Sequence, residues 1–247
     1  MVIKIKVLVL AAGYATRLYP LTENTPKPLL KVGEKTIINH ILFKLEEIKE
    51  VKEVYVVTND KFYSTFLKWG KASTFPFKLK ILNDSTLSNE DRLGAVGDIN
   101  FVIEQEKIND DLLVIAGDNL FGFSLSRFVE FFQNKNSSVV AFRDLKDRNK
   151  VKDKYGVGIV QGSRIIDFEE KPAEPKSSLA STACYLFKRN DLAYIKNMMN
   201  LKKVDALGHL IKYLAEKSEA HAFVFEEHWF DVGSFESLEE ARKVYER

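Results

Sequence analysis

The stretch LAAGYATRLYPLTENTPKPLL, residues 10–30, carries the strongest signal in this sequence. It opens as the end of a buried strand that we expect over residues 3–10. It then enters a loop that holds Arg17, Lys27 and three prolines. In an open parallel sheet, ligands bind beyond the carboxyl ends of the strands. The loop after the first strand is therefore well placed to form a binding site.

Small residues begin this loop. Ala11, Ala12 and Gly13 carry almost no side chain, so a ligand can approach their backbone N–H groups closely. The dinucleotide-binding pattern GxGxxG does not fit, because Ala15 and Leu18 stand where it needs glycine. The P-loop pattern also fails, since no Gly-Lys-Ser/Thr follows. We therefore predict a small-residue turn that binds phosphate in another way.

Lys27 lies between Pro26 and Pro28. Proline fixes its own φ and biases the preceding residue toward extended geometry, so we expect Lys27 in a pre-extended loop. Together with Arg17 it would place two cations near one polyphosphate and stabilise the charge that develops on a leaving group. Taken alone, these residues equally allow two ordinary surface cations in a stiff loop.

Strand-like and helix-like segments alternate through the first half of the chain. Alternation of this kind indicates βαβ units and a mostly parallel sheet with right-handed crossovers. We expect strands at 3–10, 54–58, 78–82, 111–118 and 138–142, and helices at 37–48, 61–69, 97–107 and 125–132.

The second half is more antiparallel in character. Residues 155–172 contain two β-runs around a Gln-Gly-Ser turn and predict a hairpin. A strand at 181–188, helices near 190–199 and 206–217, a strand at 220–225 and a helix from about 235 follow, and residues 146–154 form a polar, exposed loop. The chain is thus expected to be one α/β domain with an antiparallel elaboration.

Composition excludes several classes of function. The 37 basic and 35 acidic residues nearly cancel, so nothing indicates a nucleic-acid or membrane partner. No apolar run approaches the ~20 residues of a membrane span. The single cysteine, Cys184, lies in a strand-like segment, so we expect a buried thiol and a cytoplasmic protein. The four histidines lack metal-ligand spacing, and no Gly-x-Ser-x-Gly nucleophile elbow is present.

One carboxylate follows an entirely apolar strand. Asp118 ends the run DLLVIAGD and lies on the side of the sheet where ligands bind. Mg²⁺ prefers oxygen ligands and shares its coordination shell with substrate phosphates, so this position suits a magnesium ligand. A cap for the next element is the alternative role.

Residues 10–30 resemble the signature of the sugar-1-phosphate nucleotidyltransferases, with LAAG, a GxGTRL-like turn, PLT and PKPL in fixed order. The family's second glycine is Ala15 here. The resemblance extends from residue 3 to about 245, and its look is nearest to the glucose-1-phosphate thymidylyltransferases. It implies one catalytic domain over 1–247, with a Rossmann-like, mostly parallel mixed sheet flanked by helices. A nucleotide-binding part at about 1–145, a smaller antiparallel sugar-phosphate-binding part at about 146–235 and a C-terminal helix at about 235–247 are expected within it.

The resemblance also implies roles for individual residues. Arg17 and Lys27 would hold the pyrophosphate side and Lys171, in FEEKP, the sugar phosphate. Asp118 and Asp231, in HWFDVGS, would hold Mg²⁺. The implied nucleotide-binding residues are Ala11, Ala12, Gly13, Ala15, Thr16, Asn89 and Gly94, and the implied sugar-phosphate-binding residues are Gly156, Glu170, Lys171 and Thr182.

The substrates are the least determined part of this interpretation. Thymidylyl- and uridylyltransferases commonly carry Gln where Asn89 stands, and Asn offers the same hydrogen-bonding groups on a shorter arm. The resemblance therefore favours dTTP or UTP with glucose 1-phosphate. GTP or CTP with another phosphate acceptor stays open, as does a catalytically silent, nucleotide-sugar-binding regulatory paralogue. Relatives often form dimers or tetramers, which allows a homo-oligomer. No hexapeptide repeats are present, so we expect no acyltransferase activity of the kind some relatives add.

Overall fold

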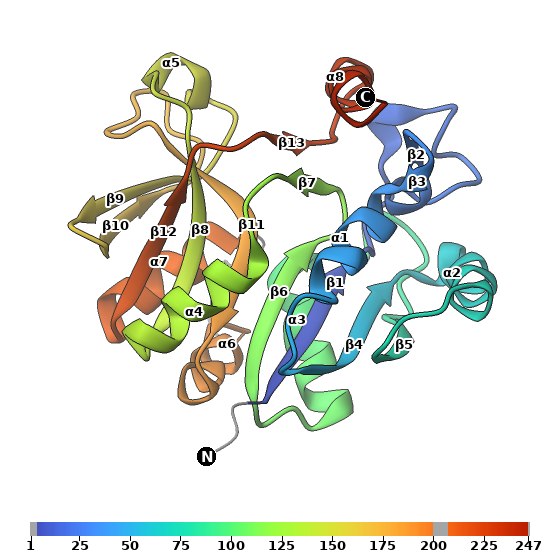
Figure 1. The fold of residues 1–247 in the computed structure, drawn as a ribbon, viewed down its shortest axis with the longest axis horizontal. Coiled ribbons are helices and arrows are strands. Elements are labelled where there is room, and N and C mark those ends of the chain that lie inside the picture. Colours follow the sequence, from blue (N-terminus) through green and yellow to red (C-terminus); the bar gives the residue numbers. More distant parts are fainter. Residues whose placement is uncertain (1–3, 200–206, 247) are drawn as a thin grey trace.

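The computed structural model describes residues 4–199 and 207–246. In its N-terminal half, four parallel strands lie in the order β5-β4-β1-β6, with helices on both faces (Figure 1). The strands are β1 (Ile5–Leu10), β4 (Val51–Thr58), β5 (Lys78–Asn83) and β6 (Asp111–Ala116). The helices are α1 (Ile37–Leu45), α2 (Asp60–Ala72) and α3 (Gly94–Glu106). This confirms the expected parallel half; residue 3, where the first strand was expected to begin, lies outside the described residues.

Antiparallel strands extend the same sheet through the second half. Strand β11 (Leu179–Phe187) pairs antiparallel with β6 and with β8 (Ser138–Asp144). Strand β12 (Ala220–Phe225) then runs parallel to β8, and the hairpin of β10 (Arg164–Glu169) and β9 (Val157–Gln161) completes the sheet. The hairpin turns at Gly162, whose φ of +60° suits glycine, as the Gln-Gly-Ser sequence predicts. The fold is therefore an α/β mixed sheet.

Two apolar layers cover the sheet because its central strands are buried on both faces. On β1, Val7 and Val9 point into the layer shared with α1 and α2, whereas Leu8 points into the layer shared with α3. Helix α4 (Leu125–Lys135) joins the first layer, and α6 (Leu192–Met199) and α7 (Leu207–Lys217) join the second. Continuous apolar strands of this kind are typical of sheets covered on both sides.

One expected loop is wrong in part. Residues 146–154 contain a one-turn helix, α5 (Arg148–Val151), which the Asp147 side chain caps by accepting from the Asn149 N–H. Val151, the last residue of this helix, is fully buried. A single apolar residue among polar neighbours is too weak a pattern to predict its burial. The predicted burial of Cys184 is confirmed, and burial raises the pKa of its thiol.

Short strands at the carboxyl ends of β1 and β6 position the site. Strand β7 (Asn119–Phe121) pairs antiparallel with β13 (Trp229–Asp231), and α8 (Phe235–Tyr245) follows β13 (Figure 1). Strands β2 (Lys31–Val32) and β3 (Lys35–Thr36) form a small ladder, and β2 contacts α8. The C-terminal segment is thereby tied to the loop after the first strand.

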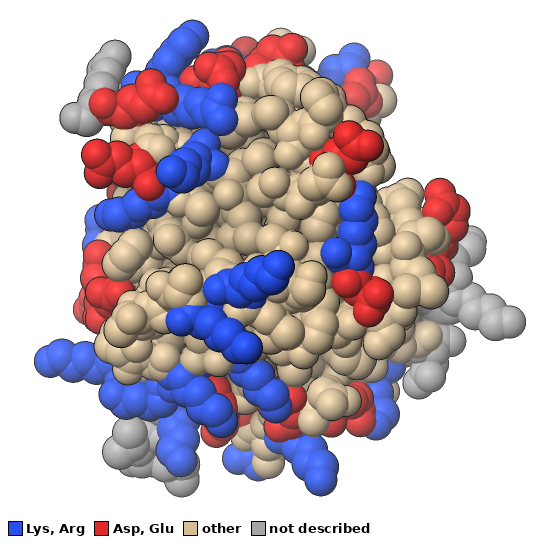
Figure 2. Space-filling view, turned by 90° about the vertical axis from the view of Figure 1, so that its right-hand side faces the viewer, with Lys and Arg blue, Asp and Glu red and all other residues tan. Residues whose placement is uncertain are grey.

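Charge is mixed over the surface. On the face shown in Figure 2, basic and acidic side chains are interspersed around a mostly uncharged middle area, in keeping with the nearly balanced net charge. Within the described ranges, no helix is both long and apolar enough to cross a membrane.

Candidate active site

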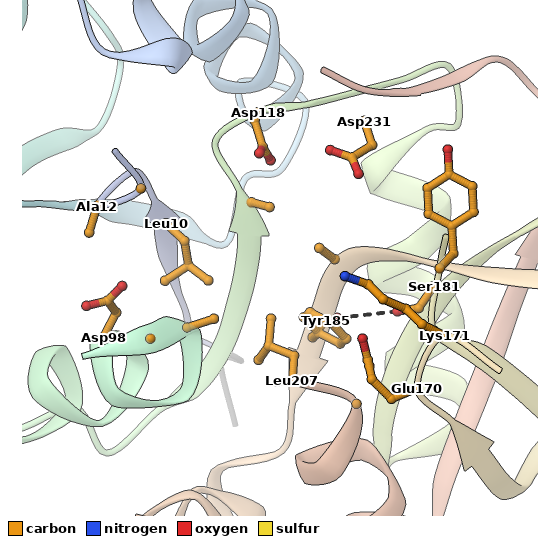
Figure 3. A pocket seen from close by; sticks show the side chains of 18 of the residues that line it. Leu10, Ala12, Asp98, Asp118, Glu170, Lys171, Ser181, Tyr185, Leu207 and Asp231 are labelled. Carbon is orange, nitrogen blue, oxygen red and sulfur yellow. Dashed lines mark hydrogen bonds between the residues drawn. The ribbon is translucent and has the colours of Figure 1, made fainter. Parts of the chain in front are cut away.

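A cavity of about 570 Å³ opens between the two halves of the sheet, beyond the carboxyl ends of β1 and β6. Figure 3 shows Leu10, Ala12 and Asp98 on one side of it and Lys171 and Glu170 on the other. The expected site residues that line it are Ala12, Gly13, Gly94, Asp118, Gly156, Glu170, Lys171 and Asp231. The structure thus brings together residues from segments that the resemblance singled out before and after residue 145.

The β7–β13 ladder explains why two carboxylates distant in sequence meet. Its register places Asp231 opposite Asn119, the residue after Asp118. The Val232 N–H donates to the Asp118 carbonyl at 3.0 Å, and the Asn119 side chain donates to Asp118 Oδ1 at 2.8 Å. Both carboxylates consequently face the top of the cavity (Figure 3).

Lys27 reaches the same point from the N-terminal loop. Its Nζ lies 2.5 Å from Asp118 Oδ2, and the pair is mostly buried. Lys27 begins a one-turn 3-10 helix, Lys27–Leu29, so the expected extended loop is wrong at this residue. Pro28 sits on Gly117, whose added Cβ would lie 3.2 Å from the proline ring and 2.7 Å from the Leu10 carbonyl. This close packing fixes Lys27 beside Asp118.

Electrostatics in this corner favour a bound cation. Burial raises the pKa of Asp231, and the neighbouring Asp118 charge adds to this, to about 6. Burial also opposes ionisation of Asp118, but Lys27 outweighs it and holds that pKa below its usual range. Burial lowers the pKa of Lys27, yet the facing Asp118 carboxylate brings it above its ordinary value. The Asp118 charge opposes ionisation of Asp231, and a divalent ion held by both carboxylates would relieve that repulsion.

The metal donor set is incomplete without substrate. Among residues 4–199 and 207–246, no group of three or more His, Cys, Asp or Glu side chains is arranged to hold a metal ion. Asp118 and Asp231 therefore offer two ligands, and phosphate oxygens and water would supply the rest. Mg²⁺ is commonly bound in this way, by one or two carboxylates plus substrate phosphates. The residues present fit the ion.

The turn after β1 is strained where the family carries glycine. Ala15 adopts the left-handed conformation, with φ 50° and ψ 38°, which glycine enters at less cost. The Thr22 hydroxyl donates to the Ala15 carbonyl at 2.7 Å and holds the turn in place. Thr16 and Arg17, in the 3-10 helix Thr16–Leu18, are exposed and do not line the cavity.

The sugar-phosphate side is built from the hairpin and from α7. Lys171 follows β10 with a positive φ of 45°, and its side chain points into the cavity (Figure 3). A Cβ added to Gly156 would lie 2.4 Å from the Phe168 ring, and one added to Gly208 would lie 2.2 Å from Glu170 Oε2. These two glycines leave the space that Glu170 and the Phe168 ring occupy.

The Thr182 side chain does not reach the cavity, contrary to expectation. Alternation along β11 places Ser181 and Tyr185 on the cavity side and Thr182 on the opposite face, where it is fully buried. Its hydroxyl donates to the Ala141 carbonyl at 2.9 Å, at a bulge where β11 leaves register with β8. Ser181 and Tyr185, whose hydroxyls lie 3.3 Å apart, line the wall instead (Figure 3).

Three further expected nucleotide-binding residues, Ala11, Ala15 and Asn89, also lie outside the cavity lining. Ala11 is buried and its N–H donates to the Val57 carbonyl. Asn89 is exposed, and its side-chain oxygen accepts from Arg92 at 3.1 Å; Arg92 lines the cavity and Asn89 does not.

A pair of carboxyl groups in the cavity wall was missed entirely. Asp84, just after β5, and Asp98, in the second turn of α3, share a side-chain hydrogen bond. Burial raises the pKa of Asp98, and the neighbouring Asp84 adds to this, to about 8. Asp98 is therefore protonated near neutral pH and donates to Asp84. The available signal was Asp98 itself, a charged residue on the buried face of the expected helix.

Other lining residues carried weak signals or none. Lys154 and Tyr155 directly precede Gly156, which the resemblance singled out, so their position in the sequence was a weak signal. Leu207 and Gly208 begin α7, and an isolated glycine in a helical pattern gives no indication of a site.

Comparison with known proteins agrees with this geometry. The family model described as nucleotidyl transferase matches residues 6–247. A putative mannose-1-phosphate guanyltransferase from Sulfolobus acidocaldarius is 29% identical over 93% of this chain and 60% of its own length. The bifunctional protein GlmU of Methanocaldococcus jannaschii is 27% identical over 96% of this chain and 53% of its own length. This chain thus spans between one half and three fifths of these curated relatives.

Solved structures share the fold over nearly the whole chain. A putative glucose-1-phosphate thymidylyltransferase from Bacillus anthracis superposes with a TM-score of 0.84 at 26% identity and covers 98% of this chain and 95% of its own. A UDP-glucose pyrophosphorylase complexed with UDP-glucose gives 0.80 at 22% identity, covers 98% of both chains and supports the fold alone. The family model, the fold and the residues gathered at the cavity lead to one conclusion: the chain belongs to the sugar-1-phosphate nucleotidyltransferase family.

Proposed function

We propose that this protein transfers a nucleotidyl group from a nucleoside triphosphate to a sugar 1-phosphate. A phosphate oxygen of the sugar phosphate attacks the α-phosphorus, the bond from that phosphorus to the bridging oxygen of the β-phosphate breaks, and pyrophosphate leaves. The observation that carries the proposal is that Asp118, which is paired with Lys27, lines one cavity together with Asp231 and Lys171.

The attacking group explains why the cavity needs no strong base. A sugar phosphate is already an anion at neutral pH, so the protein's task is to position two anions and neutralise their charge. Lys171 would hold the sugar phosphate, and Lys27 the phosphates of the nucleotide. Asp118 and Asp231 would hold Mg²⁺, which when bound supplies Lewis-acid stabilisation of the phosphoryl oxygens. Arg17 would add positive charge from the exposed 3-10 helix.

The remaining residues divide between the two substrates. The backbone of Ala12 and Gly13 would lie against the nucleotide, with Ala11, Ala15 and Thr16 shaping the turn. Glu170 and the Gly156 backbone, which both line the cavity, would lie against the sugar, with the Glu170 carboxylate accepting from sugar hydroxyls. Glucose 1-phosphate is the favoured acceptor on the resemblance to thymidylyltransferases, and the name of the Sulfolobus acidocaldarius relative supports mannose 1-phosphate as the second.

Base selection is open between two classes. The resemblance favours dTTP or UTP through Asn89, which the structure finds outside the cavity lining. The guanyltransferase name of one relative supports GTP. Each class gives the same products in kind, a nucleotide sugar and pyrophosphate.

The test is pyrophosphate release with Mg²⁺, across dTTP, UTP, GTP, CTP and ATP, each with glucose, mannose, galactose and N-acetylglucosamine 1-phosphates. Turnover with one pair well above the others supports the proposal. Binding of nucleotide by calorimetry with no turnover for any pair would support the silent, nucleotide-sugar-binding paralogue instead.

A further inference from the structure

Asn119 links the candidate metal ligand Asp118 to the aromatic ring of Trp229. Its side-chain N–H₂ donates to Asp118 Oδ1 at 2.8 Å, and its side-chain oxygen accepts from the Trp229 indole N–H at 2.6 Å. Asn119 is only 3% exposed, so little solvent competes for these two hydrogen bonds. The three residues therefore form one hydrogen-bonded chain that runs from β13 to the carboxylate.

The β7–β13 ladder brings the members of this chain together (Figure 1). Its antiparallel register places Asn119 opposite Asp231 and Phe121 opposite Trp229. Asn119 and Trp229 are thus diagonal neighbours across the ladder, a separation that a large aromatic side chain can span. The short strand β13 therefore carries one candidate metal ligand, Asp231, and also the indole that bonds to the partner of the other ligand.

The indole decides which way the Asn119 amide points. An indole N–H can only donate, so the atom of Asn119 that faces it must be the oxygen. The amide nitrogen then faces Asp118, whose ionised carboxylate can only accept. Without the indole, the amide is free to rotate and turn its oxygen toward the carboxylate, where two acceptors repel each other. Trp229 thereby secures a hydrogen bond to Asp118 that Asn119 alone does not guarantee.

This chain leaves Asp118 able to bind an ion. An ionised carboxylate has about four acceptor positions on its two oxygens. Asn119 occupies one of them on Oδ1, and Lys27 Nζ, at 2.5 Å, occupies one on Oδ2. The Asp118 side chain is 26% exposed and lines the cavity, so part of it faces the space that a ligand would fill. Asn119 and Lys27 hold the carboxylate through different oxygens and so restrict its rotation.

The Trp229 ring is itself fixed by packing. It lies edge to face against Tyr155, with 4.8 Å between the ring centroids, and it packs against a small buried apolar cluster. That cluster consists of Val151 on α5, Val157 on β9 and Ala180 on β11. The position of the indole N–H is therefore set by the part of the chain that is expected to bind the sugar phosphate.

We propose that Trp229 and Asn119 are positioning residues for the metal site: the indole fixes the amide, and the amide holds the Asp118 carboxylate in the orientation that binds Mg²⁺. This inference rests on the proposed function, in which Asp118 and Asp231 hold the ion. Removing a hydrogen-bond partner that orients a metal ligand commonly costs 10- to 100-fold in metal affinity or activity. In this role neither Trp229 nor Asn119 touches the ion or a substrate.

The two indole N–H groups of the chain provide a direct readout, because the sequence contains only two tryptophans. In ¹H–¹⁵N NMR spectra of the wild type, titration with MgCl₂ should shift the Trp229 indole signal, since a change of charge at Asp118 polarises both hydrogen bonds of the chain. The Trp69 signal is the internal control and should stay in place. Trp69 donates to Asn39 Oδ1 at 3.0 Å, the same kind of hydrogen bond, and lies outside the cavity lining. The Trp229 shift should disappear in Asp118→Asn.

Metal affinity, measured with Mn²⁺ by electron paramagnetic resonance, supplies the second readout. Trp229→Phe keeps an aromatic ring but removes the indole N–H, and it should weaken Mn²⁺ binding about tenfold; Asn119→Ala should weaken it about 10- to 100-fold. Because both act through one hydrogen-bonded chain, adding Trp229→Phe to Asn119→Ala should cost less than a further twofold. Trp69→Phe is the matched control and should keep the wild-type affinity.

Three results would overturn the positioning role. The first is a Trp229 signal that stays fixed while Mg²⁺ binds, and the second is a wild type that binds Mn²⁺ no more tightly than Asp118→Asn. The third is a pair of losses that multiply in the double variant. If Asn119→Ala does not fold, Trp229→Phe and the indole signals decide by themselves.

Activity separates this role from direct contact with the substrate. With the preferred substrate pair, Trp229→Phe should raise the Mg²⁺ concentration for half-maximal rate about tenfold and change KM for the sugar phosphate less than threefold at saturating Mg²⁺. A raised KM with an unchanged Mg²⁺ requirement would identify Trp229 as a substrate contact and overturn the inference. If no substrate pair is turned over, the proposed function fails, but the NMR and Mn²⁺ measurements still decide this inference because neither needs turnover.

Discussion

Replacing Asp98 with asparagine should change how stability depends on pH. The pKa of Asp98 is about 8 in the folded protein against an ordinary value of 3.8. A carboxyl with a raised pKa contributes stability that is complete below its unfolded value and is lost as pH rises through its folded value. Between pH 5 and pH 8 the unfolded chain has released this proton while the folded protein keeps it. The wild type should therefore lose stability across this window.

The size of the effect follows from the width of the window. Each pH unit over which the folded state holds one extra proton costs about 1.4 kcal/mol, so three units cost up to about 4 kcal/mol. An asparagine side chain cannot titrate, so the Asp98→Asn variant should match the wild type within about 1 kcal/mol at pH 5 and exceed it by a few kcal/mol at pH 8. Burial of Asp98, at 6% exposure, leaves little solvent to screen the effect.

Urea denaturation followed by the fluorescence of Trp69 and Trp229 at pH 5, 6.5 and 8 measures this difference. Because groups away from this pair, such as Asp231, titrate alike in both proteins, the comparison isolates the Asp84–Asp98 pair. Asp110→Asn serves as the control for removing an acidic side chain outside the cavity lining and should keep the wild-type slope. If Asp98→Asn shows the same pH slope as the wild type, the carboxyl is ionised in the folded state and the described proton sharing with Asp84 is wrong.

Three further predictions concern the phosphate and sugar sites. Lys27→Met should lower kcat at least ~100-fold while circular dichroism shows a folded protein, and near-normal turnover would exclude Lys27 from catalysis. The Asp231 carboxyl, with its pKa raised to about 6, is neutral below that pH, so activation by Mg²⁺ should weaken as pH falls through about 6; an unchanged Mg²⁺ titration at pH 5 would contradict this. Gly208→Ala would place a Cβ 2.2 Å from Glu170 Oε2, so KM for the sugar phosphate should rise about tenfold or more with nucleotide affinity unchanged. Gly70→Ala, with its nearest contact at 3.6 Å, is the matched control and should leave both constants unaltered.

Local sequence patterns predicted the elements well because each is decided by nearby residues. The short apolar run of β6 and the apolar stripe at helical spacing in α4 are examples, because each pattern indicates the type of element. The order of strands beyond β6 could not be obtained in this way. The pairing of β11 with both β6 and β8 joins segments far apart in the chain, and no local pattern specifies it.

The candidate site was predictable only where a segment carries its own signature. The loop at 10–30 and the end of β6 gave Lys27 and Asp118. The resemblance implied that Asp231 lies near Asp118, but the β7–β13 register that brings them together could not be obtained from local patterns. Thr182 was expected near the sugar on resemblance alone, and the alternation of β11 places its side chain on the face opposite the cavity. Asp98 was not singled out because its raised pKa depends on the neighbouring Asp84, which follows β5 and is brought to α3 only by the fold.

The central claim, attack of a sugar phosphate on the α-phosphorus, can be tested by isotope labelling. A hexose 1-phosphate carrying ¹⁸O in its phosphate group would be incubated with the preferred nucleoside triphosphate and Mg²⁺, and both products analysed by mass spectrometry. The account predicts that all the label appears in the nucleotide sugar and none in pyrophosphate. Label in the released phosphate product, or hydrolysis of the triphosphate with no nucleotide sugar formed, would contradict it.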